Sequence, residues 1–303
     1  MDKIKIIGGN RLNGQIYISG AKNAALPLIC ASLLTDETVT LTNMPMLSDI
    51  RSMNALLEQM GTQIDSFDDF VDGHATKTYS YRTQKFSSLI APYDYVRKMR
   101  ASYYVLGPVL AREGHVELSL PGGCAIGARP MDIHLSSLEQ MGATIEIKNG
   151  YVHADIKGRL KGAHITFHTA SVGATCNILM AATLAEGETV IENAAKEPEI
   201  GDLIDLLTAM GAKIEGRDSS KLTIQGVDAS FVAVQVGTGV NISARSLGAV
   251  NVQVIMEALG GGGHQTMAAA QLKHITPEAA RARIEGAIDK YYASQKKGDV
   301  EGK

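Results

Sequence analysis

One pattern occurs three times in this chain of 303 residues, and it limits the possible folds more than any other feature. In each copy an amphipathic stretch ends at a glycine, and β-branched residues follow it. The three glycines are Gly61, Gly142 and Gly211, which stand 81 and 69 residues apart. A glycine directly after an amphipathic stretch is typical of a helix end, where the backbone enters the left-handed region. Repeats of this length indicate stacked units of helices and strands that share one core.

Each copy continues into a second strand, for which residues 151–156 and 222–224 give the clearest pattern. The repeats therefore predict the α/β (α+β) class. Near Asp228 the sequence changes character. Residues 231–243 predict a β-hairpin turning at glycines 237 and 239, and residues 251–259 predict a helix that runs into four glycines and His264.

A last helix is predicted to begin at Pro277, because Thr276 can cap it and proline suits a first helical turn. Its apolar residues share one face: Ala280, Ile284, Ala287, Ile288 and Tyr291. Residues 295–303 are polar, and we expect them to be a disordered tail. At the other end, residues 3–7 and 15–19 predict two strands outside the repeats.

Composition excludes several classes of protein. The chain has 29 Lys and Arg against 32 Asp and Glu, a net charge of −3, and no basic tract for nucleic acid. No apolar stretch is long enough to cross a membrane, and residues 1–5 do not open a signal peptide. Three cysteines (Cys30, Cys124 and Cys176) fit a reducing cytoplasm, and we expect Cys30 and Cys176 to lie in the core.

Four short segments carry groups that suit phosphate or reactive chemistry. Residues 120–129 place Cys124 behind two glycines, with Arg129 five residues on. Lys22 and Asn23 open an apolar helix. Residues 96–102, which carry three cations, and Ser171-Val172-Gly173 are each predicted to begin a further helix. Helix N-termini attract anions. Each segment alone also fits an inert glycine turn, a solvated face or a simple cap; together they suggest a site for phosphorylated ligands.

The sequence resembles the UDP-N-acetylglucosamine enolpyruvyl transferase family over residues 3–227. The segments that carry the resemblance are residues 19–27, 99–108, 120–130, 171–175 and 181–200. The resemblance implies an inside-out α/β barrel domain of three βαβαββ units over residues 22–227. It also implies a cytoplasmic enzyme of peptidoglycan precursor synthesis. Its substrates would be phosphoenolpyruvate and UDP-N-acetylglucosamine, with transfer to the 3′-hydroxyl of the sugar and no cofactor or metal.

The same resemblance assigns roles to individual residues. Cys124 would be the acid that protonates phosphoenolpyruvate, and Lys22 and Arg129 would be its cationic partners. Asn23 would orient the sugar, and Arg100 would contact the sugar nucleotide. The uridine diphosphate site would be lined by Arg129, Pro130, Met131, Asp132, Ile133, Ser171, Val172 and Gly173. Thr169 stands where some members have lysine, and His134 is expected to be structural.

A second resemblance covers residues 226–292. Residues 242–246 and 260–264 resemble the C-terminal domain of DHH-family phosphodiesterases that hydrolyse cyclic di-AMP. This predicts a small α/β lobe over residues 228–294. The metals of that family sit in an Asp-His-His domain, and no Asp-His-His occurs here, so His264 is expected to be a ligand contact or a loop residue.

In the enolpyruvyl transferase family the segment that corresponds to residues 1–21 forms leading strands that pair into a second domain. That second domain also supplies the base and another arginine. Neither residue has a counterpart in this sequence, so we expect impaired turnover. The tail hairpin is a possible substitute partner for the leading strands. Two alternatives remain open: a non-catalytic fusion that binds a sugar nucleotide, and a cyclic-dinucleotide-binding module in the glycine-rich tail.

Overall fold

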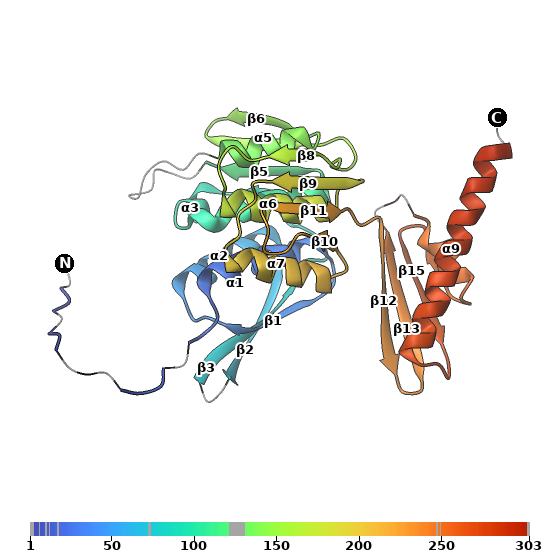
Figure 1. Cartoon of the computed structure of the whole chain (residues 1–303), viewed down its shortest axis with the longest axis horizontal. Coiled ribbons are helices and arrows are strands. Elements are labelled where there is room, and N and C mark those ends of the chain that lie inside the picture. Colours follow the sequence, from blue (N-terminus) through green and yellow to red (C-terminus); the bar gives the residue numbers. More distant parts are fainter. Residues whose placement is uncertain are drawn as a thin grey trace.

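The structure, a computed structural model, describes residues 3–5, 7–9, 11, 13–16, 18–71, 74–120, 131–246, 248 and 250–301. Figure 1 shows a large α/β body formed by the first part of the chain and a small lobe at its side formed by the last part. The two parts have separate hydrophobic cores, one formed by residues between 25 and 224 and one by residues between 240 and 291.

Two of the three repeats form complete βαβαββ units. The second unit contains β4 (Ile90–Ala91), α3 (Tyr93–Val96), η2 (Arg100–Val105), α4 (Leu106–Glu113), β5 (His115–Ser119), α5 (Asp132–Gln140), β6 (Thr144–Lys148) and β7 (Tyr151–Asp155). The third contains β8 (His164–Thr166), α6 (Val172–Thr183), β9 (Glu188–Glu192), α7 (Pro198–Ala209), β10 (Lys213–Glu215) and β11 (Lys221–Gln225). In each unit the first two strands are parallel and the other pairings are antiparallel, with strand orders β4-β5-β7-β6 and β8-β9-β11-β10.

Among the described residues, the first repeat has the same order of elements without a leading strand. It contains α1 (Lys22–Ala31), η1 (Ser32–Leu34), β1 (Val39–Met44), α2 (Ser48–Met60), β2 (Gln63–Val71) and β3 (His74–Arg82). Its three strands pair antiparallel in the order β1-β3-β2 among the described residues. The helix ends agree with the sequence, since Gly61, Gly142 and Gly211 all have positive φ.

The helices lie at the centre of the body and the sheets surround them, which confirms the predicted inside-out arrangement (Figure 1). Helix α6 shows why. All of its residues from Gly173 to Thr183 are buried, and it contacts α4, α5 and α7. A mainly apolar helix with no exposed face is stable only when other elements enclose it. The strands bury alternate residues against these helices, as Val116 and Leu118 do in β5.

The predicted leading strands are absent from the part of the segment that the structure describes, and the prediction is wrong there. The described residues between 3 and 20 form neither helix nor strand and pair with no part of the tail. Ile16 and Ile18 are about nine-tenths exposed, at 90 % and 89 %. A strand needs a neighbour for its N–H and C=O groups, and no described strand pairs with this segment.

The cationic segment also differs from its prediction, because it does not begin an α-helix. Arg97 follows the short helix α3, and Arg100 is the first residue of the 3₁₀ helix η2. Helix α4 begins only at Leu106, two residues before Pro108. Proline is tolerated in the first turn of a helix and breaks its interior, so a continuous helix from Arg97 would place Pro108 where it does not fit.

The small lobe is a four-stranded sheet in the order β12-β13-β15-β14 with two helices. Its elements are β12 (Ala229–Val236), β13 (Gly239–Ser246), α8 (Val252–Glu257), β14 (Gly262–His264), β15 (Met267–Leu272) and α9 (Pro277–Glu301). The predicted hairpin is confirmed by β12 and β13, and the predicted apolar face of α9 packs on the lobe's core. Helix α9 continues to Glu301, and the disorder expected for residues 295–303 stays a prediction.

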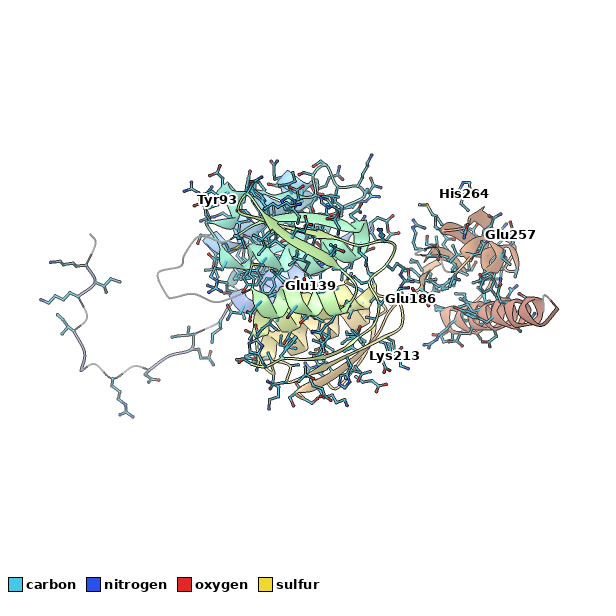
Figure 2. The ribbon with its side chains drawn as sticks, turned by 90° about the horizontal axis from the view of Figure 1, so that it is seen from above. Tyr93, Glu139, Glu186, Lys213, Glu257 and His264 are labelled. Carbon is cyan, nitrogen blue, oxygen red and sulfur yellow. The ribbon has the colours of Figure 1, made fainter. Side chains whose placement is uncertain are left out.

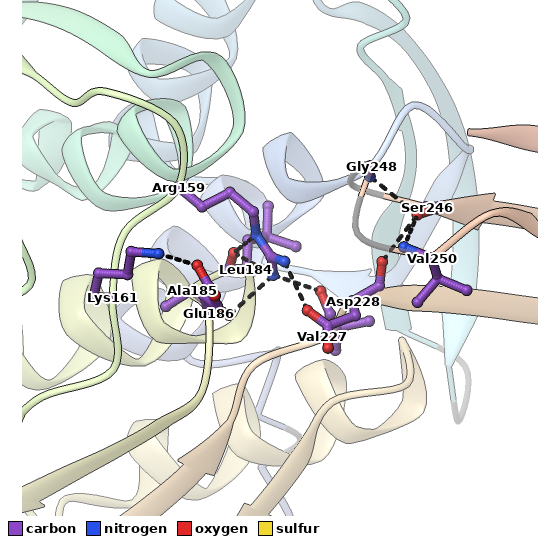
Figure 3. Close-up of polar contacts among 10 residues, drawn as sticks. All are labelled: Arg159, Lys161, Leu184, Ala185, Glu186, Val227, Asp228, Ser246, Gly248 and Val250. Atoms are coloured by element: carbon purple, nitrogen blue, oxygen red, sulfur yellow. Dashed lines mark hydrogen bonds and ion pairs between the residues drawn. The ribbon is translucent and has the colours of Figure 1, made fainter. Parts of the chain in front are cut away.

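The lobe joins the body through a segment that Arg159 holds in place (Figure 3). Its guanidinium donates to the carbonyl oxygens of Leu184, Ala185 and Val227, and Nη1 lies 2.7 Å from Oδ1 of Asp228. The side chain is only 16 % exposed. Arg159 therefore has two roles. It donates hydrogen bonds to carbonyl groups just after the end of α6, and it holds the residues that lead into the lobe.

We expect Arg159→Leu to reduce the free energy of unfolding by about 2 kcal/mol, because hydrogen bonds to a charged group would be lost and carbonyls left without donors. Chemical denaturation would measure this. The matched control is Arg217→Leu, which removes an exposed arginine paired with Asp205 and Asp218. Exposed ion pairs contribute little, so equal losses in the two variants would contradict the role given to Arg159.

Candidate functional site

A pocket of about 650 Å³ opens where the N-terminal ends of α1 and α6 approach η2 and α5. It is formed mainly by polar and charged side chains and by backbone at helix starts. Its lining residues are Lys22, Asn23, Leu26, Asp49, Lys98, Met99, Arg100, Ala101, Tyr103, Tyr104, His134, Ala170, Ser171, Val172, Gly173 and Glu199.

Three cations face this pocket. Lys22 is the first residue of α1, Arg100 is the first residue of η2, and Lys98 precedes it. The Nζ atom of Lys22 lies 3.0 Å from Oδ2 of Asp49 on α2, and the lysine side chain is 48 % exposed. A half-exposed ion pair of this kind is weak, so Lys22 can turn to an anionic ligand at little cost.

The N-terminus of α6 forms the opposite side of the pocket. Ser171 caps the helix, and its Oγ accepts a hydrogen bond of 3.3 Å from the N–H of Ala174. The first N–H groups of a helix have no partner within it and carry a partial positive charge. The pocket therefore offers backbone donors as well as cations to a phosphate group.

Position 173 leaves little room for a side chain. A Cβ atom there would lie 2.9 Å from the hydroxyl oxygen of Tyr103 and 3.2 Å from Cε1 of His134. Both rings therefore pack directly against the backbone of α6, and they contact each other edge to face at 4.9 Å. This close packing brings η2, α5 and α6 together around the pocket.

His134 lies on α5 and is only 4 % exposed. Burial lowers the pKa of its imidazole to about 4, so the ring is neutral at pH 7. Its Nδ1 atom lies 3.0 Å from Nδ2 of the buried Asn177 on α6. The sequence predicts a structural role for His134. The structure gives it buried packing and also places it on the pocket wall.

Six of the residues predicted for the site line this pocket: Lys22, Asn23, Arg100, Ser171, Val172 and Gly173. Met131, Asp132 and Ile133 lie at the start of α5 beside it, and do not line it. The predicted acid Cys124, with Arg129 and Pro130, falls outside the described residues. Sequence reasoning missed Asp49 and Glu199, which line the pocket from α2 and α7; isolated acidic residues at helix starts carry no signal that separates them from ordinary surface charges.

The other two cysteines are buried in the core, as predicted. Burial raises the pKa of the Cys30 thiol and of the Cys176 thiol well above its ordinary value. Both sulfurs therefore stay protonated. Among the described residues, no group of three or more His, Cys, Asp and Glu side chains could hold a metal ion.

Two glycines of the tail's run, Gly261 and Gly263, have a packing explanation. A Cβ atom on Gly261 would lie 2.1 Å from the carbonyl oxygen of Ala269, and one on Gly263 would lie 2.5 Å from that of Met267. Strand β14 thus approaches β15 too closely for side chains at these positions. His264 ends β14 and is exposed, and Figure 2 shows it on the lobe, away from the body.

Searches of protein families and of known proteins identify two kinds of relative. The profile of EPSP synthase (3-phosphoshikimate 1-carboxyvinyltransferase) matches residues 6–240, and that of the DHHA1 domain matches residues 208–293. The UDP-N-acetylglucosamine 1-carboxyvinyltransferase of Paramagnetospirillum magneticum is 57 % identical over 229 residues, which are 75 % of this chain and 53 % of that protein. The enzyme of the same name from Acinetobacter baylyi is 50 % identical over 82 % of this chain and 59 % of its own.

The chain thus spans about half the length of the curated relatives it matches. Among solved structures, the enolpyruvyl transferase NikO from Streptomyces tendae superimposes with a TM-score of 0.59 at 21 % identity, over 73 % of this chain and 50 % of that one. That likeness shows the fold. Within the described residues, no helix is both long and apolar enough to span a bilayer.

Proposed function

Because the chain belongs to the EPSP synthase family of enolpyruvyl transferases, with a DHHA1 domain at its C-terminal end, we propose that its body binds UDP-N-acetylglucosamine and phosphoenolpyruvate. The proposed reaction transfers the enolpyruvyl group to the sugar 3′-hydroxyl and releases phosphate, in the cytoplasmic synthesis of peptidoglycan precursors. The observation that carries the proposal is the pocket in which Lys22 and Arg100 face the N-terminus of α6. Relatives with 50–57 % identity bear the name of this activity.

The reaction needs an acid, a base and groups that hold anions. In the proposal Cys124 protonates C3 of phosphoenolpyruvate, and a base removes the proton of the sugar hydroxyl as its oxygen attacks C2. The C–O bond to phosphate then breaks as C3 loses a proton, which restores the C2–C3 double bond of the transferred enolpyruvyl group. Lys22 and Arg129 hold the anionic groups of phosphoenolpyruvate, Asn23 orients the sugar, and Arg100 contacts the nucleotide.

The nucleotide is proposed to place its diphosphate at the N–H groups of Val172 and Gly173, beside Ser171. Arg129 and Pro130, together with Met131, Asp132 and Ile133 at the start of α5, are proposed to complete the uridine diphosphate site. Oriented donors of this kind hold a phosphate without a metal ion. The close approach to β15 accounts for Gly261 and Gly263, whereas Gly262 has open space around it; the cyclic-dinucleotide alternative therefore stays a second candidate that the pocket of the body does not support.

We further propose that the 303-residue chain binds the sugar nucleotide and turns it over slowly. No described residue in the pocket is assigned as the base, and the chain matches about half of each relative. General base help accounts for about 10²–10⁴ of an enzyme's rate. Slow turnover would leave binding as the main measurable property of the chain.

Calorimetric titration with UDP-N-acetylglucosamine tests the proposal. We expect the unmodified chain to bind. In Arg100→Ala the dissociation constant should be at least about tenfold higher, since a charged contact contributes about 1.5–3 kcal/mol. Lys148→Ala is the matched control, because Lys148 is an exposed cation on β6 that does not line the pocket. Absence of binding, or equal weakening by both substitutions, would refute the proposed site. Phosphate release from phosphoenolpyruvate, followed in parallel, should stay near background.

A further inference from the structure

Asn177 connects three segments around the pocket from a wholly buried position on α6. Its Oδ1 accepts a 2.8 Å hydrogen bond from the N–H of Gly107, and its Nδ2 donates a 3.0 Å hydrogen bond to the carbonyl oxygen of Tyr103. A backbone N–H can only donate and a backbone carbonyl can only accept. These two partners therefore fix which end of the Asn177 amide is oxygen and which is nitrogen.

The fixed amide determines the tautomer of His134. The second hydrogen of Asn177 Nδ2 is directed to Nδ1 of His134, 3.0 Å away, so Nδ1 must accept. A neutral imidazole that accepts at Nδ1 carries its proton on Nε2. The charged groups that act on the ring are Asp132 on the same helix and Arg100 on η2, and they oppose each other.

Nε2 of His134 has no hydrogen-bond partner among the residues that the structure describes. The residue is only 4 % exposed, but Nε2 is not one of the enclosed side-chain atoms that lack a partner, so it reaches the open space of the pocket that His134 lines. The ring lies against the start of α6, since its Cε1 atom is 3.2 Å from the place of a Cβ on Gly173. The neighbouring N–H groups of the helix start are donors too. Nε2–H is therefore free to donate to water or to an acceptor that a ligand brings into the pocket.

We propose that His134 donates a hydrogen bond from Nε2 to a phosphate oxygen held at the N-terminus of α6, and that Asn177 is the positioning residue that holds His134 in this tautomer. This inference rests on the proposed function, because the phosphate belongs to the diphosphate of the sugar nucleotide. The other donors of the site are backbone groups and mobile cations. A neutral donor in a fixed orientation makes the binding of phosphate depend more strongly on the position of its oxygen atoms. It should favour diphosphate ligands over uridine alone.

Two substitutions of His134 separate its donor from its packing. His134→Leu removes the donor, and His134→Gln keeps an amide N–H near the place of Nε2. We expect His134→Leu to weaken binding of UDP-N-acetylglucosamine about tenfold in calorimetry, His134→Gln to stay within about threefold of the unmodified chain, and neither to change the binding of uridine. Equal affinity in the unmodified chain and in His134→Leu would overturn the inference and leave the proposed function standing.

The tautomer is measured independently of any nucleotide by long-range ¹H–¹⁵N NMR of the 303-residue chain. We expect His134 to be protonated at Nε2 and not at Nδ1, and inorganic pyrophosphate to shift its Nε2 resonance. A ring protonated at Nδ1, or an unperturbed Nε2 in saturating pyrophosphate, would refute the inference. If UDP-N-acetylglucosamine does not bind at all, the proposed function fails, and the pyrophosphate titration still decides the role of His134.

Discussion

Replacing Gly226 with alanine is expected to reduce the free energy of unfolding by about 3 kcal/mol or more, because overpacking against backbone cannot be relieved by a side-chain rotation. A Cβ atom at this position would lie 1.8 Å from the carbonyl oxygen of Ala185. The backbone cannot easily move away, because the N–H of Gly226 donates to the carbonyl of Gly187 and the N–H of Val227 donates to that of Thr183.

Thermal and chemical unfolding of Gly226→Ala would measure this loss. Gly286→Ala is the matched control, since Gly286 lies within α9 with open space around it. Alanine is the better helix former, so the control should be neutral or more stable by up to about 1 kcal/mol. A Gly226→Ala chain as stable as the control would show that the segment leading into the lobe is not held against the body as described.

The sequence predicts a change of character near residues 226–228, and the structure shows how the two sides are joined there. Gly226 permits the close approach to Ala185, Arg159 holds the carbonyls of Ala185 and Val227, and Ser246 donates to the carbonyl of Asp228 (Figure 3). These contacts are long-range. They depend on residues far apart in the sequence, and no local sequence pattern predicts them.

The parts of the fold that the sequence predicted are those set by local chemistry. A capping serine, a closing glycine and apolar spacing located the start of α6 and the ends of the helices near Gly61 and Gly211. The predictions failed where a segment's state depends on a partner. Residues 15–19 have the alternation of a strand, but alternation alone does not supply a neighbour.

The candidate site was predicted in its phosphate-binding part and missed elsewhere, for a related reason. Lys22 and Gly173 belong to short motifs with a recognisable chemistry. Asp49 and Asn177 reach the site through tertiary packing, because Asp49 faces Lys22 from another helix and Asn177 meets His134 only after α5 and α6 pack together. Their contribution becomes visible only in three dimensions.

The buried His134 is expected to make the chain less stable in mild acid, by about 3 kcal/mol between pH 7 and pH 4. Its pKa is about 4 in the folded chain, and the ordinary value in an unfolded chain is about 6.5. Below pH 6.5 the unfolded chain therefore binds a proton that the folded chain does not bind until about pH 4. The stabilisation by the neutral ring is fully present above pH 6.5 and is lost as the pH falls toward 4.

Urea unfolding of the unmodified chain and of His134→Gln at several pH values would isolate this effect. Carboxylates also titrate near pH 4, but they do so in both chains and cancel in the difference between them. Glutamine has no ionisable group, so the difference in stability should shift in favour of His134→Gln by about 3 kcal/mol as the pH falls from 7 to 4. A pH-independent difference would mean that His134 is protonated at the same pH in both states. The pocket would then hold a ring open to water, and the neutral donor inferred at the start of α6 would lose its physical basis.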